Sequence, residues 1–101
     1  MEFSVLVTVY KKEIPENLRK SLLNSYKQTV KPKEIILVCD GELTEALNEE
    51  IERLKIEIPI LSVYHLPENL GSGPTSRFGV KQCQTELIAR IDSDDYCVER
   101  F

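Results

Sequence analysis

Two apolar runs separated by a stretch of helical periodicity constrain the fold of this chain more than any other feature. Residues 3–9 read FSVLVTV and residues 34–39 read EIILVC. Both runs are rich in β-branched residues and lack the polar alternation of a half-exposed strand. Between them, Leu18, Leu22 and Tyr26 recur at helical spacing. The sequence therefore predicts a strand buried on both faces, a helix, and a second buried strand.

The same alternation continues through the rest of the chain. Apolar residues at helical spacing predict a second helix over 43–54, with Thr44 or Glu42 near its start, and a third, weaker helix over 74–84. Strands are predicted over 59–66 and 86–91. The order β-α-β-α-β-α-β predicts an α/β domain with a mostly parallel sheet and helices on both faces.

This architecture predicts where a ligand would bind. In open α/β sheets, ligands occupy the crevice beyond the carboxyl ends of the strands. Four separate segments follow those ends, namely Thr8 to Tyr10, Asp40 and Gly41, the loop 65–73, and Asp92 to Asp95. We expect them to meet at one edge of the sheet, and their convergence is stronger evidence for a site than any single motif.

Composition excludes several classes of protein. The net charge of −4 and the pI of about 5.0 argue against broad nucleic-acid binding, which needs a basic surface. No apolar run approaches the roughly 18 residues of a membrane-spanning helix, and the N-terminus lacks the basic region of a secretory signal. Cys39, Cys83 and Cys97 are widely spaced and odd in number, which favours reduced thiols. We expect a cytoplasmic protein, either free or at the inner face of the membrane.

The acidic segment after the last predicted strand is the first candidate site. Asp92, Ser93, Asp94 and Asp95 follow an apolar run directly. Carboxylate oxygens are the ligands that Mg²⁺ and Mn²⁺ prefer. In an extended segment Asp92 and Asp94 would share one face. The alternative interpretation is a solvated turn, because Asp and Ser are common turn residues.

The glycine-rich loop before the third predicted helix is the second candidate. Residues 69–76, NLGSGPTS, place Gly71 and Gly73 at two positions of the dinucleotide-binding fingerprint, but Ser76 stands at the third. A dinucleotide-binding oxidoreductase fragment is therefore one alternative, and a flexible loop is the other. Arg77 is available either to pair with a phosphate or to be solvated on the helix surface.

Four stretches together resemble a known family. SVLVTVY, SLLNSYKQTVKPKEIILVCDG, NLG and LIARIDSDDY, in this order and spacing, are similar to the N-terminal half of family 2 glycosyltransferases of the Rossmann-like GT-A fold. The chain also resembles bacterial exopolysaccharide and capsule enzymes of the amylovoran type, in which VCDG and ARxDSDD occur as well. The resemblance implies a nucleotide-sugar donor such as a UDP-sugar, Mg²⁺ or Mn²⁺ as cofactor, and a saccharide or lipid-linked acceptor in cell-surface polysaccharide synthesis.

The resemblance also implies roles for individual residues. The segment matching Thr8, Val9 and Tyr10 lines the nucleoside pocket, and the residue matching Asp40 contacts the base. The residues matching Asp92 and Ser93 meet the ribose and the diphosphate, and those matching Asp94 and Asp95 hold the metal. Gly71 and Arg77 are assigned to the donor as well. This chain departs from the family at Cys39, where a second aspartate is common, and at Ser76 and Arg77, where Arg and Asn are usual.

Family catalytic domains continue well beyond the last motif. We therefore expect residues 1–101 to be the donor-binding part of a domain truncated at its C-terminus, and we assign no catalytic residue within it. An uncovered sheet edge or helix face would favour self-association. A non-enzymatic α/β interaction domain is the remaining alternative.

Overall fold

A computed structural model describes residues 2–92 of the chain, although not the side chain of Asp92. Its sheet has four parallel strands in the order β3-β2-β1-β4, which confirms the predicted fold class. The elements in chain order are β1 (Phe3–Val9), α1 (Pro15–Lys27), β2 (Glu34–Cys39), α2 (Glu45–Glu57), β3 (Leu61–His65), α3 (Ser72–Gln82) and β4 (Leu87–Asp92).

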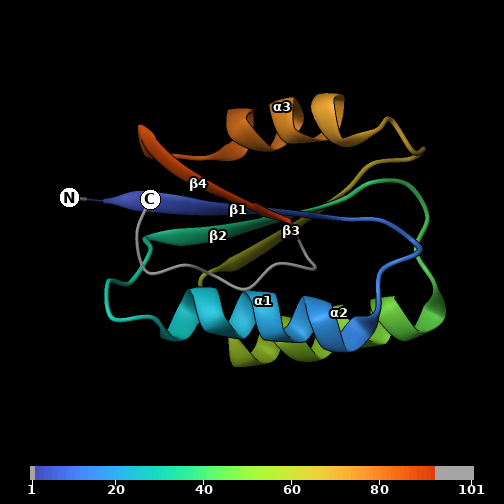
Figure 1. The fold of residues 1–101 in the computed structure, drawn as a ribbon, viewed down its shortest axis with the longest axis horizontal. Helices are drawn as coiled ribbons and strands as arrows, with labels where there is room; N and C mark the ends of the chain where they lie inside the picture. Colours follow the sequence, from blue (N-terminus) through green and yellow to red (C-terminus); the bar gives the residue numbers. More distant parts are fainter. Residues whose placement is uncertain (1, 93–101) are drawn as a thin grey trace.

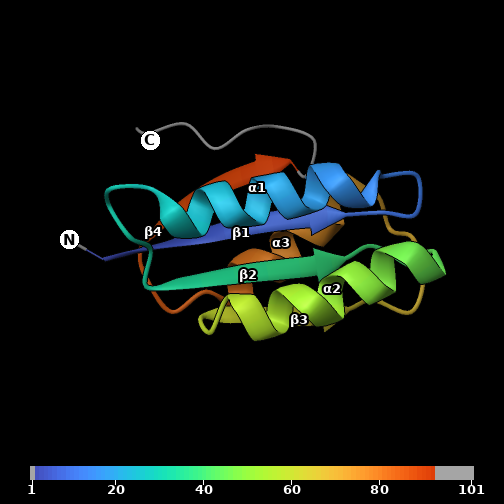
Figure 2. The same ribbon diagram turned by 90° about the horizontal axis from the view of Figure 1, so that it is seen from below.

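The helices cover both faces of the sheet. Figure 1 shows α1 and α2 below it and α3 above it, and Figure 2 shows α1 and α2 running along the strands. Successive residues of β1 alternate between the two layers: Val5 and Val7 pack in the core under α1 and α2, whereas Leu6 packs with Ile36 and Val38 under α3. Burial on both faces explains why β1 reads as a continuous apolar run.

Helices α1 and α2, on one face of the sheet, are connected by ion pairs as well as by apolar packing. Arg19 of α1 donates to Glu50 at 2.8 Å and to Glu57 at 2.6 Å, and both acceptors lie on α2. The N-terminus of α2 is capped by Thr44, whose hydroxyl accepts the Leu47 N–H at 3.2 Å. This confirms Thr44, rather than Glu42, as the start signal of that helix.

Most of the predicted boundaries of α2, β3, α3 and β4 differ from the structure by one to three residues, and the starts of β3 and α3 have a clear physical reason. β3 begins at Leu61 rather than at Pro59, because the Leu61 N–H donates to the Ile58 carbonyl at 3.1 Å and closes a turn there. α3 begins at Ser72 rather than at Pro74. Proline is tolerated in a first helical turn because its missing N–H would have no partner there.

The contact of α3 with the sheet depends on Gly79. This glycine is buried, and a Cβ atom added to it would overlap the Leu6 side chain and lie 3.1 Å from Val38 Cγ2. A residue that weakens the helical pattern therefore lets α3 approach β1 and β2 closely. Among the described residues, no helix is both long and apolar enough to span a membrane.

Candidate functional site

The carboxyl ends of the strands meet at one edge of the sheet, as predicted. The register pairs Thr8 with Val38 on one side and with Asp92 on the other. The Asp40 N–H donates to the Val9 carbonyl at 2.8 Å, so strand pairing continues one residue beyond β2. The structure thus brings Thr8, Val9, Asp40 and the backbone of Asp92 together at this edge.

The side chain of Asp40 binds the loop that follows β3. Its carboxylate accepts the Leu70 N–H at 2.7 Å through Oδ1 and the Gly71 N–H at 3.1 Å through Oδ2. The residue itself is only 7% exposed. The sequence predicted a ligand contact for this carboxylate, whereas in the structure both of its oxygens accept backbone hydrogen bonds.

Gly41 makes this approach of the loop sterically feasible. Its φ of +84° lies in the left-handed region, and an added Cβ would stand only 2.8 Å from the Asn69 backbone nitrogen. The Asn69 side chain also donates to the Asp40 carbonyl at 3.4 Å. Neither contact was predicted, although the Asp-Gly pair directly after a strand was a signal that the backbone turns sharply there.

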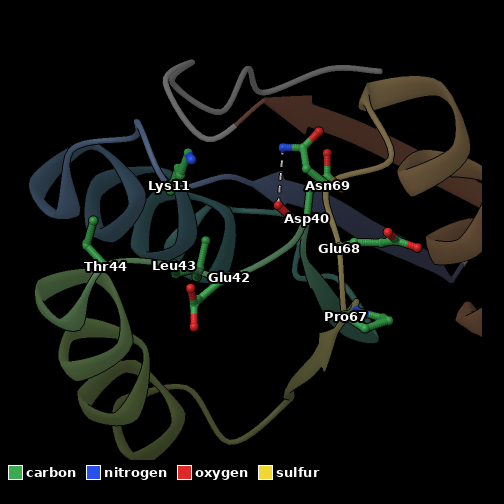
Figure 3. A pocket seen from close by; sticks show the side chains of 8 residues that line it. All are labelled: Lys11, Asp40, Glu42, Leu43, Thr44, Pro67, Glu68 and Asn69. Carbon is green, nitrogen blue, oxygen red and sulfur yellow. Dashed lines mark hydrogen bonds between the residues drawn. The ribbon is translucent and has the colours of Figure 1, made fainter.

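A pocket of about 310 Å³ opens beside Asp40 (Figure 3). Its walls come from three separate segments, and Figure 3 shows Lys11 facing the loop of Glu68 and Asn69 across it. The lining residues are Lys11, Asp40, Glu42, Leu43, Thr44, Pro67, Glu68 and Asn69. From the sequence, Asp40 was assigned to a ligand, and Pro67, Glu68 and Asn69 belong to the loop 65–73 that was expected at this edge. No motif pointed to the other lining residues.

Tyr10 directly follows β1 at the same edge of the sheet. It is 46% exposed, and its carbonyl accepts the Glu13 N–H at 3.0 Å in a tight turn between β1 and α1. Thr8 is half-buried within β1. The ring of Tyr10 is thus accessible to a flat ligand, as the nucleoside interpretation requires.

The two remaining predicted donor-binding residues, Gly71 and Arg77, lie at the start of α3 and on its second turn. Gly71 is the N-cap, with a φ of +92°, and its carbonyl accepts the Thr75 N–H at 3.2 Å. Arg77 is exposed, and its Nη1 lies 3.8 Å from where a Cβ on Gly73 would stand, so the guanidinium extends back over the first turn. Arg77 forms no hydrogen bond or ion pair with any described residue. The buried Thr75 hydroxyl likewise has no partner among them.

The predicted metal ligands are not tested by the structure. Ser93, Asp94 and Asp95 lie outside the described residues, and within residues 2–92 no group of three or more His, Cys, Asp or Glu side chains could hold an ion. The described backbone reaches the ligand edge at Asp92, the last residue of β4, which pairs with Thr8. Carboxylate oxygens are the ligands that Mg²⁺ and Mn²⁺ prefer, so the residue types of the predicted set suit such a cation.

The family follows from a comparison with known proteins. Residues 4–100 match the model of the family described as glycosyl transferase family 2. The chain belongs to this family. Amylovoran biosynthesis glycosyltransferase AmsE of Erwinia amylovora is 41% identical over 100 residues, which cover 98% of this chain and 37% of that protein. The resemblance to exopolysaccharide enzymes is thereby confirmed, and the dinucleotide-binding alternative is not favoured.

Solved structures agree with this placement. The S. aureus TarS 1–349 complex with UDP-GlcNAc superimposes with a TM-score of 0.80 at 30% identity, covering 98% of this chain and 28% of that one. The mannosyltransferase PcManGT from Pyrobaculum calidifontis, in complex with GDP-Man and Mn²⁺, gives a TM-score of 0.81 at 19% identity over 94% of this chain and 28% of that one. The latter likeness shows the GT-A fold alone. The chain spans roughly a third of the lengths of these proteins, from 28% to 37%.

Proposed function

We propose that this chain forms the donor-binding part of a glycosyltransferase that moves a sugar from a nucleoside diphosphate, UDP in the first instance, to a saccharide or lipid-linked acceptor in cell-surface polysaccharide synthesis. The observation that carries the proposal is the pocket beside Asp40, at the edge where β1, β2 and β4 deliver their carboxyl ends. The TarS complex with UDP-GlcNAc and the amylovoran relative support the donor and the process.

The two ends of the donor are assigned to different parts of this edge. Thr8, Val9 and Tyr10 would line the nucleoside, with the exposed ring of Tyr10 stacking on the base. Asp40 lies at this end, beside the pocket.

The diphosphate would lie toward the end of β4 and the start of α3. β4 ends there at Asp92, Ser93 is the next residue in sequence, and the guanidinium of Arg77, which has no partner among the described residues, extends over the first turn of α3. An arginine is suited to phosphate because its planar group offers several N–H donors.

GT-A glycosyltransferases generally use a divalent metal, and a structural neighbour contains Mn²⁺. In this chain Asp94 and Asp95 would hold Mg²⁺ or Mn²⁺, with Asp94 as the direct ligand. When bound, the cation offsets the charge that develops on the leaving diphosphate. We also propose a cytoplasmic location, which the free thiols of Cys39 and Cys83 support, since reduced cysteines are typical of that compartment.

Calorimetry with UDP tests the donor and the metal together. We expect tighter UDP binding with Mn²⁺ or Mg²⁺ than with chelator, and Asp94→Asn should remove most of that difference. Glu16→Gln is the matched control, because it removes one negative charge from the exposed surface of α1. Equal affinity with and without metal would contradict the metal assignment, and tighter binding of NAD than of UDP would contradict the donor.

A further inference from the structure

We propose that Asp40 is a positioning residue, whose carboxylate holds the loop 66–71 against the end of β2 and thereby determines where α3 begins. The contacts themselves are independent of any ligand, whereas their consequence for the donor depends on the proposed function. This role differs from a contact with the base, because Asp40 would act through the backbone of the loop.

Both oxygens of the Asp40 carboxylate already accept hydrogen bonds from the protein backbone. Each oxygen accepts one backbone N–H, from Leu70 at 2.7 Å and from Gly71 at 3.1 Å. The side chain is nearly buried, so water offers these two N–H groups little alternative. Hydrogen bonds to an ionised acceptor are stronger than neutral ones. The loop is therefore held by a contact that costs free energy to break.

The contact is transmitted to α3 through the backbone of Gly71. This residue donates its N–H to Asp40, and its carbonyl accepts the first helical hydrogen bond from Thr75 at 3.2 Å. A carboxylate at the N-terminus of a helix also interacts favourably with the helix dipole. Because Arg77 is carried on the second turn of α3, the position of its guanidinium depends on where this helix starts.

A second contact makes the arrangement specific. Gly41 lets the backbone of Asn69 approach so closely that any Cβ at position 41 would stand 2.8 Å from the Asn69 nitrogen. The loop that is held in this way also forms one wall of the pocket, through Pro67, Glu68 and Asn69. Asp40 and Gly41 together thus connect the pocket wall at the base end to the helix start at the diphosphate end.

Amide hydrogen exchange of the ligand-free chain tests the contact directly. In Asp40→Asn the side-chain amide can accept only one of the two N–H groups, so exchange at Leu70 and Gly71 should accelerate by about tenfold or more, relative to the amides of β1. Expressing exchange relative to β1 keeps the test decisive if a variant lowers global stability. Gly41→Ala leaves the carboxylate in place but displaces Asn69, and should accelerate the same two amides.

Gly73→Ala is the matched control for these exchange measurements. An added Cβ there meets only Arg77 Nη1, at 3.8 Å, so exchange at Leu70 and Gly71 should not change. If these two amides exchange as fast in the unmodified chain as in both the Asp40 and the Gly41 variants, the proposal is overturned.

Nucleotide binding then separates positioning from direct base contact. UDP and its N3-methylated analogue, which lacks the base N–H, are titrated against the unmodified chain, Asp40→Asn, Gly41→Ala and the double variant. Positioning predicts that both single variants weaken both nucleotides by the same factor, and that the double variant is no weaker than the worse single one.

Two other results have distinct meanings. A loss in Asp40→Asn that is confined to UDP, with Gly41→Ala unaffected, would show that Asp40 contacts the base and would overturn positioning as its role. If the unmodified chain binds neither nucleotide, the proposed donor is wrong, while the exchange result still decides whether Asp40 holds the loop.

Discussion

Cys39 illustrates how the interior sets the chemistry of a single residue. It ends β2, and its side chain is fully buried in the core between the sheet and helices α1 and α2. Desolvation raises the pKa of this thiol from its ordinary value of 9.0 to about 12. A small apolar side chain suits this position because no buried charge has to be compensated.

This environment makes Cys39 unreactive. Since alkylation requires a thiolate and the raised pKa leaves almost none at pH 8, we expect no modification of Cys39 by iodoacetamide in the folded chain. The half-buried Cys83, whose pKa is raised chiefly by desolvation as well, should react slowly. Peptide mass spectrometry checks both sites, with the urea-unfolded chain as the reference. Modification of Cys39 at the same rate in both states would show that β2 ends differently.

At the scale of elements, the packing of α3 against the sheet is the contact that the hydrophobic pattern of the sequence predicted least well. The helix has few apolar residues, and its buried residues are Thr75 and Gly79 rather than large side chains. Gly79 lets Leu6 and Val38 reach the helix backbone. The helix is held by close approach to the sheet and by the loop contacts of Asp40 at its start.

Gly79→Ala tests this packing. Alanine is the better helix former by about 1 kcal/mol, but its Cβ would overlap Leu6, and such overpacking costs about 1–3 kcal/mol. We expect a net loss in the free energy of unfolding measured in urea. Gly73→Ala on the first turn meets no such obstacle and should be neutral or stabilising. Stabilisation by the Gly79 variant would mean that α3 lies farther from the sheet.

The ion pairs between α1 and α2 predict a pH effect. The hydrogen bond from Arg19, at 2.6 Å, is the main cause that lowers the pKa of Glu57 below its ordinary value of 4.5. A carboxyl with a lowered folded-state pKa stabilises the fold above its unfolded pKa, and this contribution is lost as pH falls through the folded value. Glu57→Gln should therefore destabilise the chain slightly at pH 7, and by progressively less below about pH 4.5.

Thermal unfolding across this pH range, at low and high salt, measures the difference. Glu52→Gln is the control, because among residues 2–92 the ion-pair partner of Glu52 is Lys55 of the same helix. High salt should reduce the effect of Glu57→Gln, since Glu57 is exposed and Arg19 is partly exposed. A difference that persists unchanged at pH 3 would show that the charge of Glu57 is not its cause.

At the scale of the molecule, the sheet has two edges among residues 2–92. β3 pairs only with β2 and β4 only with β1, so each leaves one side without a described strand. Leu87, the first residue of β4, is 48% exposed. Unpaired strand edges and exposed apolar residues are the features that favour pairing between copies.

We therefore expect the 101-residue chain to self-associate as its concentration rises. Analytical ultracentrifugation measures this, and Leu87→Lys should shift the chain toward monomer because a charge on an edge opposes pairing. Val30→Lys, on the exposed turn after α1, is the control for added charge. If the chain is monomeric at all concentrations, the expectation that its exposed strand edges or apolar residues drive self-association is wrong.

The order of strands and helices, their burial on both sheet faces and the edge that carries Asp40 were all predictable from the sequence. These properties depend on local periodicity and on the general rule that parallel strands end at one edge. The sequence also places Thr8, Tyr10 and Asp92 at that edge, because each lies near the end of an apolar run or directly after it.

The tertiary structure alone decided what these residues contact. Asp40 meets Leu70 and Gly71 across 30 and 31 positions of sequence, and Gly41 meets Asn69 across a similar separation. No periodicity encodes such partners, since they depend on the path of a loop between two correctly predicted elements. Backbone N–H groups look alike at every position, so only the folded chain determines which of them reaches a given carboxylate.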